Sequence, residues 1–287
     1  MKTTILLCAI TAAGFSALQG APLAQGTFTE IIRNVNKLGP GGEAVPANLN
    51  ETLKAPERVR TGADSRAELT APDNTITRIG ANTVFAFDTS QRVLHLDRGS
   101  VLFHAPKGAG GGTIKSGGAS AAVLGTTIIV SATPGGGFKL IVLEGTAKAT
   151  LDNGNTAELK AGQLVFVLPG GEAFSETLTV NLGKLAANSQ LVSGFSHPLP
   201  SITLIDAAIH QQHILISSGR AVDTGRSADT FHDGPGNGQS GIDPASHQIA
   251  LHPNLTPNQI GAIIGGPKGG GSLGGSGLVP LTGRSPN

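Results

Sequence analysis

The sequence contains no tryptophan, no tyrosine and a single cysteine among its 287 residues. Proteins usually bind sugar rings and single-stranded bases by stacking them on aromatic side chains, so this composition disfavours carbohydrate and nucleic-acid binding. The 20 basic and 19 acidic residues nearly cancel, which leaves almost no net charge to attract nucleic acid. Hydrophobic residues make up 39% of the chain, enough to fill a sizeable core.

The N-terminal segment is apolar and carries no charge after Lys2. Residues 3–18 are rich in isoleucine, leucine and alanine, and small or turn-forming residues follow, a pattern typical of a secretory signal peptide. We therefore predict a signal peptide at residues 1–20, cleaved near Gly20, with cleavage near Ala24 or Gly26 as the alternatives. An uncleaved anchor would need about 20 apolar residues, and polar residues interrupt this run.

Export would restrict the chemistry available to the mature protein. Cys8 lies inside the signal peptide, so the mature chain would have no disulfide, no catalytic thiolate and no cysteine-bound zinc. We expect an exported protein, periplasmic or extracellular, with no stable membrane span in the mature chain.

Residues 27–168 have the pattern of short β-strands separated by turns. Residues 92–96 and 100–104 each have the pattern of a strand, and in 100–104 Val101 and Phe103 point to the same side and offer a core face. Residues 127–130, 140–143 and 164–168 are continuous apolar runs typical of central strands covered on both faces. Residues 152–155 (Asp-Asn-Gly-Asn) predict a hairpin turn. The pattern predicts a mainly β domain at residues 21–171, either a β-sandwich or a short β-helix of about a dozen short strands.

Periodicity changes after residue 171. Ile202, Ile205, Ile209 and Ile216 form one stripe of a predicted helix with Ser201 as its N-cap, and a shorter helix is expected between residues 180 and 191. We assign 172–219 as a helical extension. We assign 220–287 as a flexible, disordered tail, because glycine occupies nine of the seventeen positions from 261 to 277.

The strand region contains a series of spaced motifs, at residues 59–62, 65–69, 75, 78–80, 82–85, 96–102, 123–130, 144–145 and 159–163. In this order they resemble the FecR-type domain, the extracytoplasmic β-rich module of iron-transport regulators. In well-known members a cytoplasmic domain contacts a sigma factor and the periplasmic part senses a transporter. Only Met1 and Lys2 precede the apolar segment here, so we expect no direct sigma-factor regulation and a FecR-like protein that lacks the cytoplasmic anti-sigma segment. The resemblance implies a non-enzymatic, protein-binding β-domain.

Several short patterns could carry chemistry, but each has a simpler interpretation. Asp223-Thr224-Gly225 matches one half of an aspartic-protease site, and no second copy of the tripeptide is present. His210 and His213 would share a helix face, with His197, His232 or Asp233 as a third metal ligand, but their spacing matches no defined zinc motif. The glycine-rich stretches at 108–112 and 234–238 lack a P-loop ending, and no serine lies in a Gly-x-Ser-x-Gly frame. We therefore predict no catalytic, cofactor-binding or metal-binding residues and no cofactor.

The favoured hypothesis is an exported, non-enzymatic FecR-like protein that acts as a protein-binding or sensory module in the cell envelope. Its partner would be another envelope or surface protein, and the scarcity of aromatic anchors favours binding through an open sheet edge. The alternative is a self-associating structural protein of the envelope or matrix.

Overall fold

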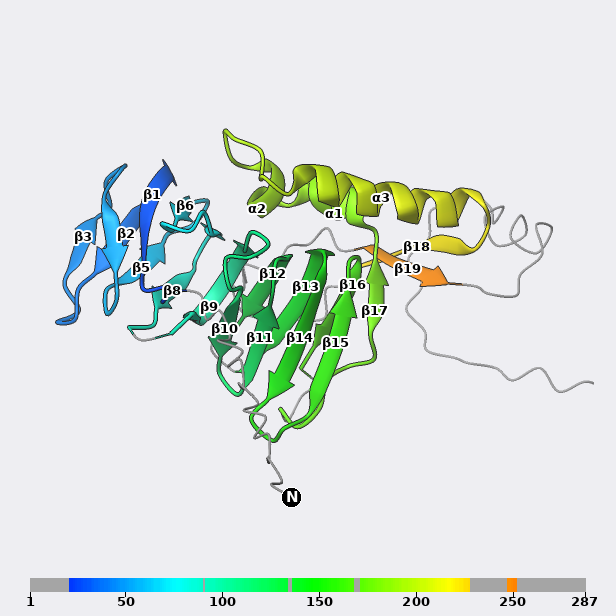
Figure 1. Cartoon of the computed structure of the whole chain (residues 1–287), viewed down its shortest axis with the longest axis horizontal. Coiled ribbons are helices and arrows are strands. Elements are labelled where there is room, and N and C mark those ends of the chain that lie inside the picture. Colours follow the sequence, from blue (N-terminus) through cyan, green and yellow to red (C-terminus); the bar gives the residue numbers. More distant parts are fainter. Residues whose placement is uncertain (1–20, 90, 134–135, 168–170, 228–246, 252–287) are drawn as a thin grey trace, which may run out of the picture.

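The computed structural model describes residues 21–89, 91–133, 136–167, 171–227 and 247–251. The predicted signal peptide, with Cys8, lies outside the described residues. So do the parts of the predicted flexible tail at 228–246 and 252–287, and with them His232, Asp233 and the glycines of 234–238. The described part contains nineteen strands and three helices (Figure 1).

The first sheet, sheet A, is antiparallel throughout, with the strand order β4-β1-β6-β7-β9-β12-β13-β16-β17-β19-β18. Its strands are β1 (Gln25–Ile32), β4 (Thr52–Lys54), β6 (Arg66–Thr70), β7 (Ile76–Ile79), β9 (Val93–His104), β12 (Thr127–Ala132), β13 (Phe138–Glu144), β16 (Gln163–Phe166), β17 (Leu178–Val180), β18 (Ala221–Ser227) and β19 (His247–Leu251).

The second sheet, sheet B, has the order β3-β2-β5-β8-β9-β10-β11-β14-β15, antiparallel except for the parallel pair β9–β10. Its further strands are β2 (Val35–Leu38), β3 (Ala44–Pro46), β5 (Arg58–Thr61), β8 (Val84–Phe87), β10 (Gly112–Ser116), β11 (Ala119–Val123), β14 (Thr146–Leu151) and β15 (Thr156–Lys160).

Strand β9 belongs to both sheets. Its N-terminal half pairs with β8 and β10 in sheet B, and its C-terminal half pairs with β7 and β12 in sheet A. The sequence pattern predicted two strands here, at 92–96 and 100–104, but the chain continues through Gly99 at φ 90°. A Cβ at Gly99 would lie 2.5 Å from Thr83 Cα, so only glycine lets the strand bend this close to its neighbour.

The two sheets pack face to face around one apolar core. Phe28, Phe85, Phe103 and Phe138 are all fully buried between the sheets, together with aliphatic side chains from both. The architecture is therefore a β-sandwich, and this decides between the two predicted alternatives, sandwich and β-helix. Residues 21–171 contain sixteen strands, more than the predicted dozen.

A helical layer covers the outer face of sheet A. Helices α1 (Leu182–Asn188), α2 (Gln190–Ser193) and α3 (Ile202–Ser217) lie together on one side of the strands (Figure 1). Ile129, Ile141 and Leu143 from sheet A form a second core with Leu185 and Ile205 from the helices. Strands β12 and β13 are consequently buried along their whole length, as the continuous apolar runs predicted.

The predicted stripe of α3 faces the sheet: Ile205 is fully buried and Ile209 packs against the second core. Ser201 occupies the N-cap position, as predicted, but its side chain makes no capping hydrogen bond. The sequence did not predict β18 or β19, which extend sheet A beyond β17 within the region assigned as a flexible tail. None of the helices in the described ranges is long and apolar enough to cross a membrane.

A fully buried arginine anchors the helical layer to sheet A. Arg78 on β7 donates from Nε to Glu68 Oε2 at 2.8 Å. Its η nitrogens donate to three backbone carbonyls of the helical extension, those of Leu191, Val192 and His197. The guanidinium also stacks over the Phe195 ring, 4.4 Å from its centroid. The Arg78 side chain thus connects sheet A to the helical extension, a segment more than a hundred positions later in the chain.

Replacing this arginine should strongly destabilise the protein. Arg78→Met keeps the apolar stem but removes the guanidinium donors from three buried carbonyls and from the Glu68 carboxylate, which keeps only the Thr29 hydroxyl as a side-chain donor. We expect it to lower the free energy of unfolding by about 3–5 kcal/mol. The control is Arg33→Met, which breaks the exposed Arg33–Asp64 pair and should cost less than about 1 kcal/mol. Urea unfolding of both variants measures the difference, and equal losses would contradict the anchoring role.

Candidate functional site

Among the residues that the structure describes, none forms a layer over the outer face of sheet B formed by β10, β11, β14 and β15. In β10, β11, β14 and β15 residues alternate between buried and exposed, so each strand turns one set of side chains to the core and the other outward. We call the outward set the open face. It consists of Thr113, Lys115, Ser120, Ala122, Thr146, Lys148, Thr150, Thr156, Glu158 and Lys160.

The open face ends at an unpaired strand edge. The Asn155 C=O accepts a hydrogen bond from β14 and the Ala161 N–H donates one to Gly145. Because hydrogen-bonded pairs alternate in an antiparallel ladder, the even-numbered residues of β15 direct their N–H and C=O groups away from β14. The Lys160 N–H does so, since it donates to Gln163 Oε1 at 2.8 Å. Within the described ranges no strand pairs with this side of β15.

The hairpin that carries this edge follows from the sequence. The turn between β14 and β15 has Gly154 at φ 89°, a conformation that glycine adopts without strain, and the Gly154 N–H donates to the Leu151 carbonyl. The predicted hairpin at 152–155 is thus confirmed. The opposite edge of sheet B, β3, ends at Pro46, which has no N–H to offer a partner strand.

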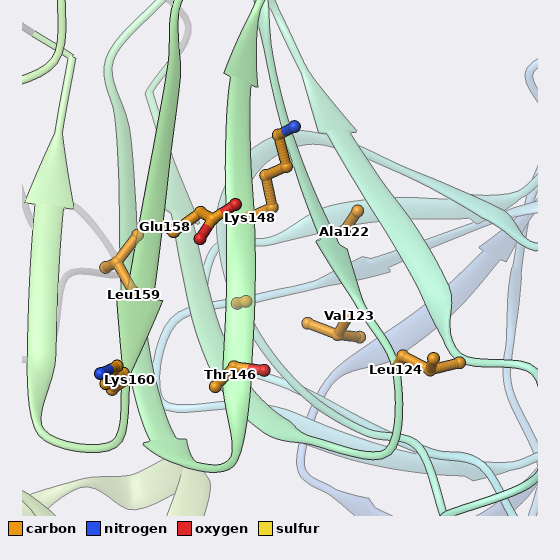
Figure 2. Close-up of a pocket in the computed structure, with 9 residues that line it drawn as sticks. Ala122, Val123, Leu124, Thr146, Lys148, Glu158, Leu159 and Lys160 are labelled. Atoms are coloured by element: carbon orange, nitrogen blue, oxygen red, sulfur yellow. The ribbon is translucent and has the colours of Figure 1, made fainter.

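A depression of about 400 Å³ lies on the open face across β11, β14 and β15 (Figure 2). Ala122 and Thr146 are short residues within it, and the longer side chains of Lys148 and Lys160 stand around it. Leu124, just after β11, adds an apolar side chain that is 76% exposed. A hollow of this shape suits a protruding side chain of another macromolecule better than a small molecule that must be enclosed.

A second cluster of polar groups is buried between sheet A and the start of α3. Thr127 Oγ1 donates to Glu144 Oε1 at 2.8 Å, lies 2.8 Å from Ser201 Oγ and 2.9 Å from His104 Nδ1. The four side chains are at most 5% exposed. Burial raises the pKa of the Glu144 carboxyl and lowers the pKa of the His104 imidazole. This cluster explains why Ser201 does not cap its helix: its hydroxyl is engaged by Thr127.

The buried cluster has no access for a substrate and serves to join α3 to the sheet. A serine, a threonine, a carboxylate and an imidazole are the groups of hydrolytic enzymes, but here a threonine lies between the serine and both titratable groups. Sequence reasoning missed this cluster, since its members come from three strands and a turn that only the fold brings together.

The catalytic candidates of the sequence are not brought together. Asp223 lies on β18, where its carboxylate accepts from Asn181 Nδ2 and pairs with Lys184 Nζ at 2.6 Å. His210 and His213 are exposed on α3, and among the described residues no group of three potential ligands could hold a metal ion.

The sequence comparisons identify the class of this sandwich. Residues 57–148, from β5 into β14, match the model of the family described as FecR protein. The FecR resemblance that the sequence motifs predicted is thus confirmed for these residues. The match is shorter than the predicted β domain at 21–171, and Arg78 and the first strands of the open face lie within it. No curated protein matches the chain.

Two crystal structures of candidate anti-sigma factors from Parabacteroides distasonis ATCC 8503 are similar to this chain. The first has a TM-score of 0.41 and 15% identity, and the match covers 47% of this chain and 64% of that one. The second has a TM-score of 0.42 and 14% identity, with 72% of this chain and 89% of that one covered. The chain thus spans less than two thirds of the first of these structures.

The buried carboxyl should make stability depend on pH. Glu144 binds its proton more tightly in the folded protein, because its pKa is raised there. Its contribution to the stability of the fold is therefore present below pH 4.5, its ordinary pKa, and is lost as pH rises through the raised pKa. His104 has a lowered pKa in the folded protein, so its effect on stability has the opposite dependence on pH. Its contribution to the stability of the fold is present above pH 6.5, its ordinary pKa, and is lost as pH falls through the lowered pKa.

We expect Glu144→Gln, which keeps an acceptor for Thr127, to gain stability relative to the unchanged protein as pH rises from about 4 to about 7. Urea midpoints across this range give the difference at each pH. Glu158→Gln, which removes an exposed carboxylate, is the control. The difference between its urea midpoint and that of the unchanged protein should depend less on pH. A difference for Glu144→Gln that does not change with pH would contradict the raised pKa.

Proposed function

We propose that this protein is an exported, non-enzymatic FecR-like module that binds another protein of the cell envelope through the open face of sheet B and the edge of β15. The observation that carries the proposal is the unequal covering of the two sheets. Sheet A is covered by sheet B on one face and by helices on the other, whereas sheet B has an outward face with exposed residues and a strand edge next to it.

Strand edges offer a means of binding that suits this composition. A partner segment that pairs with β15 would gain main-chain hydrogen bonds and would not need the tyrosine or tryptophan anchors that the chain lacks. The charged residues Glu158 and Lys160 on this short strand would at the same time discourage unspecific edge-to-edge aggregation.

The fold favours cleavage near Gly20 over the two later sites. The Ala21 carbonyl accepts from Arg92 Nη1 at 2.8 Å, and the Leu23 side chain is 2% exposed in the core between the sheets. Cleavage near Ala24 or Gly26, the other sites that the sequence left open, would remove Leu23 from the core. The burial of Leu23 therefore supports processing before this residue.

We expect the exported protein to begin at Ala21 or within a residue of it, and to retain Leu23, as determined by intact mass and N-terminal sequencing. Leu23→Ala should cost about 2–5 kcal/mol of unfolding free energy. Leu49→Ala, at a position that is 57% exposed, should change it by no more than about 0.5 kcal/mol. A mature N-terminus beyond Leu23 would refute the proposed processing.

In-cell photo-crosslinking tests the binding face. A photoreactive residue at Ala122, on the open face, should crosslink one envelope protein reproducibly in the source organism, and the same residue at Ala207, exposed on α3, should not. Mass spectrometry identifies the product. Crosslinks from Ala207 alone, or none from either position, would overturn the proposed binding face.

The second candidate function, a self-associating structural protein, predicts a different product. Ala122 would then crosslink only to further copies of this chain. The same experiment thus separates the two functions, and exclusive self-crosslinks would replace the binding-module proposal with the structural one.

A further inference from the structure

The open face has more basic than acidic residues, although the whole chain is nearly neutral. Lys115, Lys148 and Lys160 lie on it with a single acidic residue, Glu158, whereas the complete sequence has 20 basic and 19 acidic residues. The three lysines are exposed, and their side chains take part in none of the ion pairs of the described part. Their charge is therefore available to a partner.

The depression is lined by two of these cations, Lys148 on β14 and Lys160 on β15. Ala122 on β11 lies directly opposite Lys148 on β14, which in turn lies opposite Glu158 on β15. Lys160 lies opposite Thr146, in the pair next to Lys148 and Glu158 on the same face of β14 and β15. Figure 2 shows Lys148 and Glu158 next to each other on neighbouring strands. Glu158 thus offsets part of one lysine's charge, and Lys160, beside the short Thr146, has no acidic residue directly opposite it.

The depression combines this charge with apolar surface. Ala122 and the exposed Leu124 offer aliphatic contact, and Lys148 and Lys160 offer ammonium groups at the margin. A complementary surface would present an aliphatic side chain flanked by carboxylates. Two copies of the open face would bring lysine against lysine, which disfavours a second copy of this chain as the occupant.

We infer that the open face binds an acidic segment of a partner protein, with an aliphatic side chain seated in the depression and carboxylates beside Lys148 and Lys160. This inference rests on the proposed function and adds the chemistry of the partner. Small side chains such as Ser120, Ala122 and Thr146 keep the face low, so an extended segment can lie across it without steric conflict.

The test uses a short capped peptide in which glutamate and leucine alternate, added to the isotopically labelled mature protein. We expect amide chemical-shift changes centred on Ala122, Thr146, Lys148 and Lys160, and none with the same peptide carrying lysine in place of glutamate. Lys148→Glu combined with Lys160→Glu should weaken binding about tenfold, since two attractions become repulsions. Glu158→Lys should strengthen it about threefold by removing the one repulsive group.

Lys54→Glu is the matched control, because Lys54 is an exposed lysine on β4 of the other sheet. This variant should bind the acidic peptide with unchanged affinity. Shift changes that map away from the open face, or equal weakening by Lys54→Glu, would overturn the inference. A second competing outcome is that phosphatidylglycerol vesicles or duplex DNA bind at the same residues as tightly as the acidic peptide, or more tightly. The open face would then bind a lipid or nucleic-acid phosphate, and the inference would also be overturned.

The same variants separate this inference from the proposed function in cells. If the Ala122 crosslink to an envelope protein disappears in the double lysine variant and persists in Lys54→Glu, both statements hold. If the crosslink persists in the double variant, the face binds a partner without using its charge, and only the inference fails. If no partner crosslink forms in any variant, the proposed function itself fails.

Discussion

The structure depends on covering sheet A on both faces. Strands β12 and β13 are apolar along their whole length, so one face needs sheet B and the other needs the helices. The helical cover is held where Arg78 crosses from the sheet to the carbonyls of the α2 region. A buried guanidinium is tolerated only when its donors are satisfied, so this contact sets the position of the helical layer as well as its attachment.

The open face follows from the same constraint. The chain uses its helices on sheet A, and sheet B is left with one buried and one exposed side. The exposed side of β10, β11, β14 and β15 consists of alanine, serine, threonine, lysine and one glutamate, which can remain in water without cost. Both cores therefore lie against sheet A, one of them shared with sheet B, and the surface available for recognition lies on sheet B.

Reactive groups are present but are used for structure. The His104, Thr127, Glu144 and Ser201 side chains satisfy one another inside the protein, and Asp223 binds Asn181 and Lys184. Asp223, His210 and His213 stand in short familiar patterns of the sequence. The buried cluster has no such pattern, because Thr127 and Ser201 are 74 positions apart and only packing makes them neighbours.

The sequence by itself determined the β-rich class, the central strands, the hairpin at Gly154, the apolar stripe of α3 and the FecR resemblance, because each depends on local periodicity or on residues at fixed spacing. Only the tertiary structure decided that the strands form a sandwich, that β9 joins both sheets through Gly99, and that β18 and β19 extend sheet A. It alone also decided which polar face is left uncovered. Pairing between distant strands depends on how two faces fit together, and alternation along one strand does not contain that information.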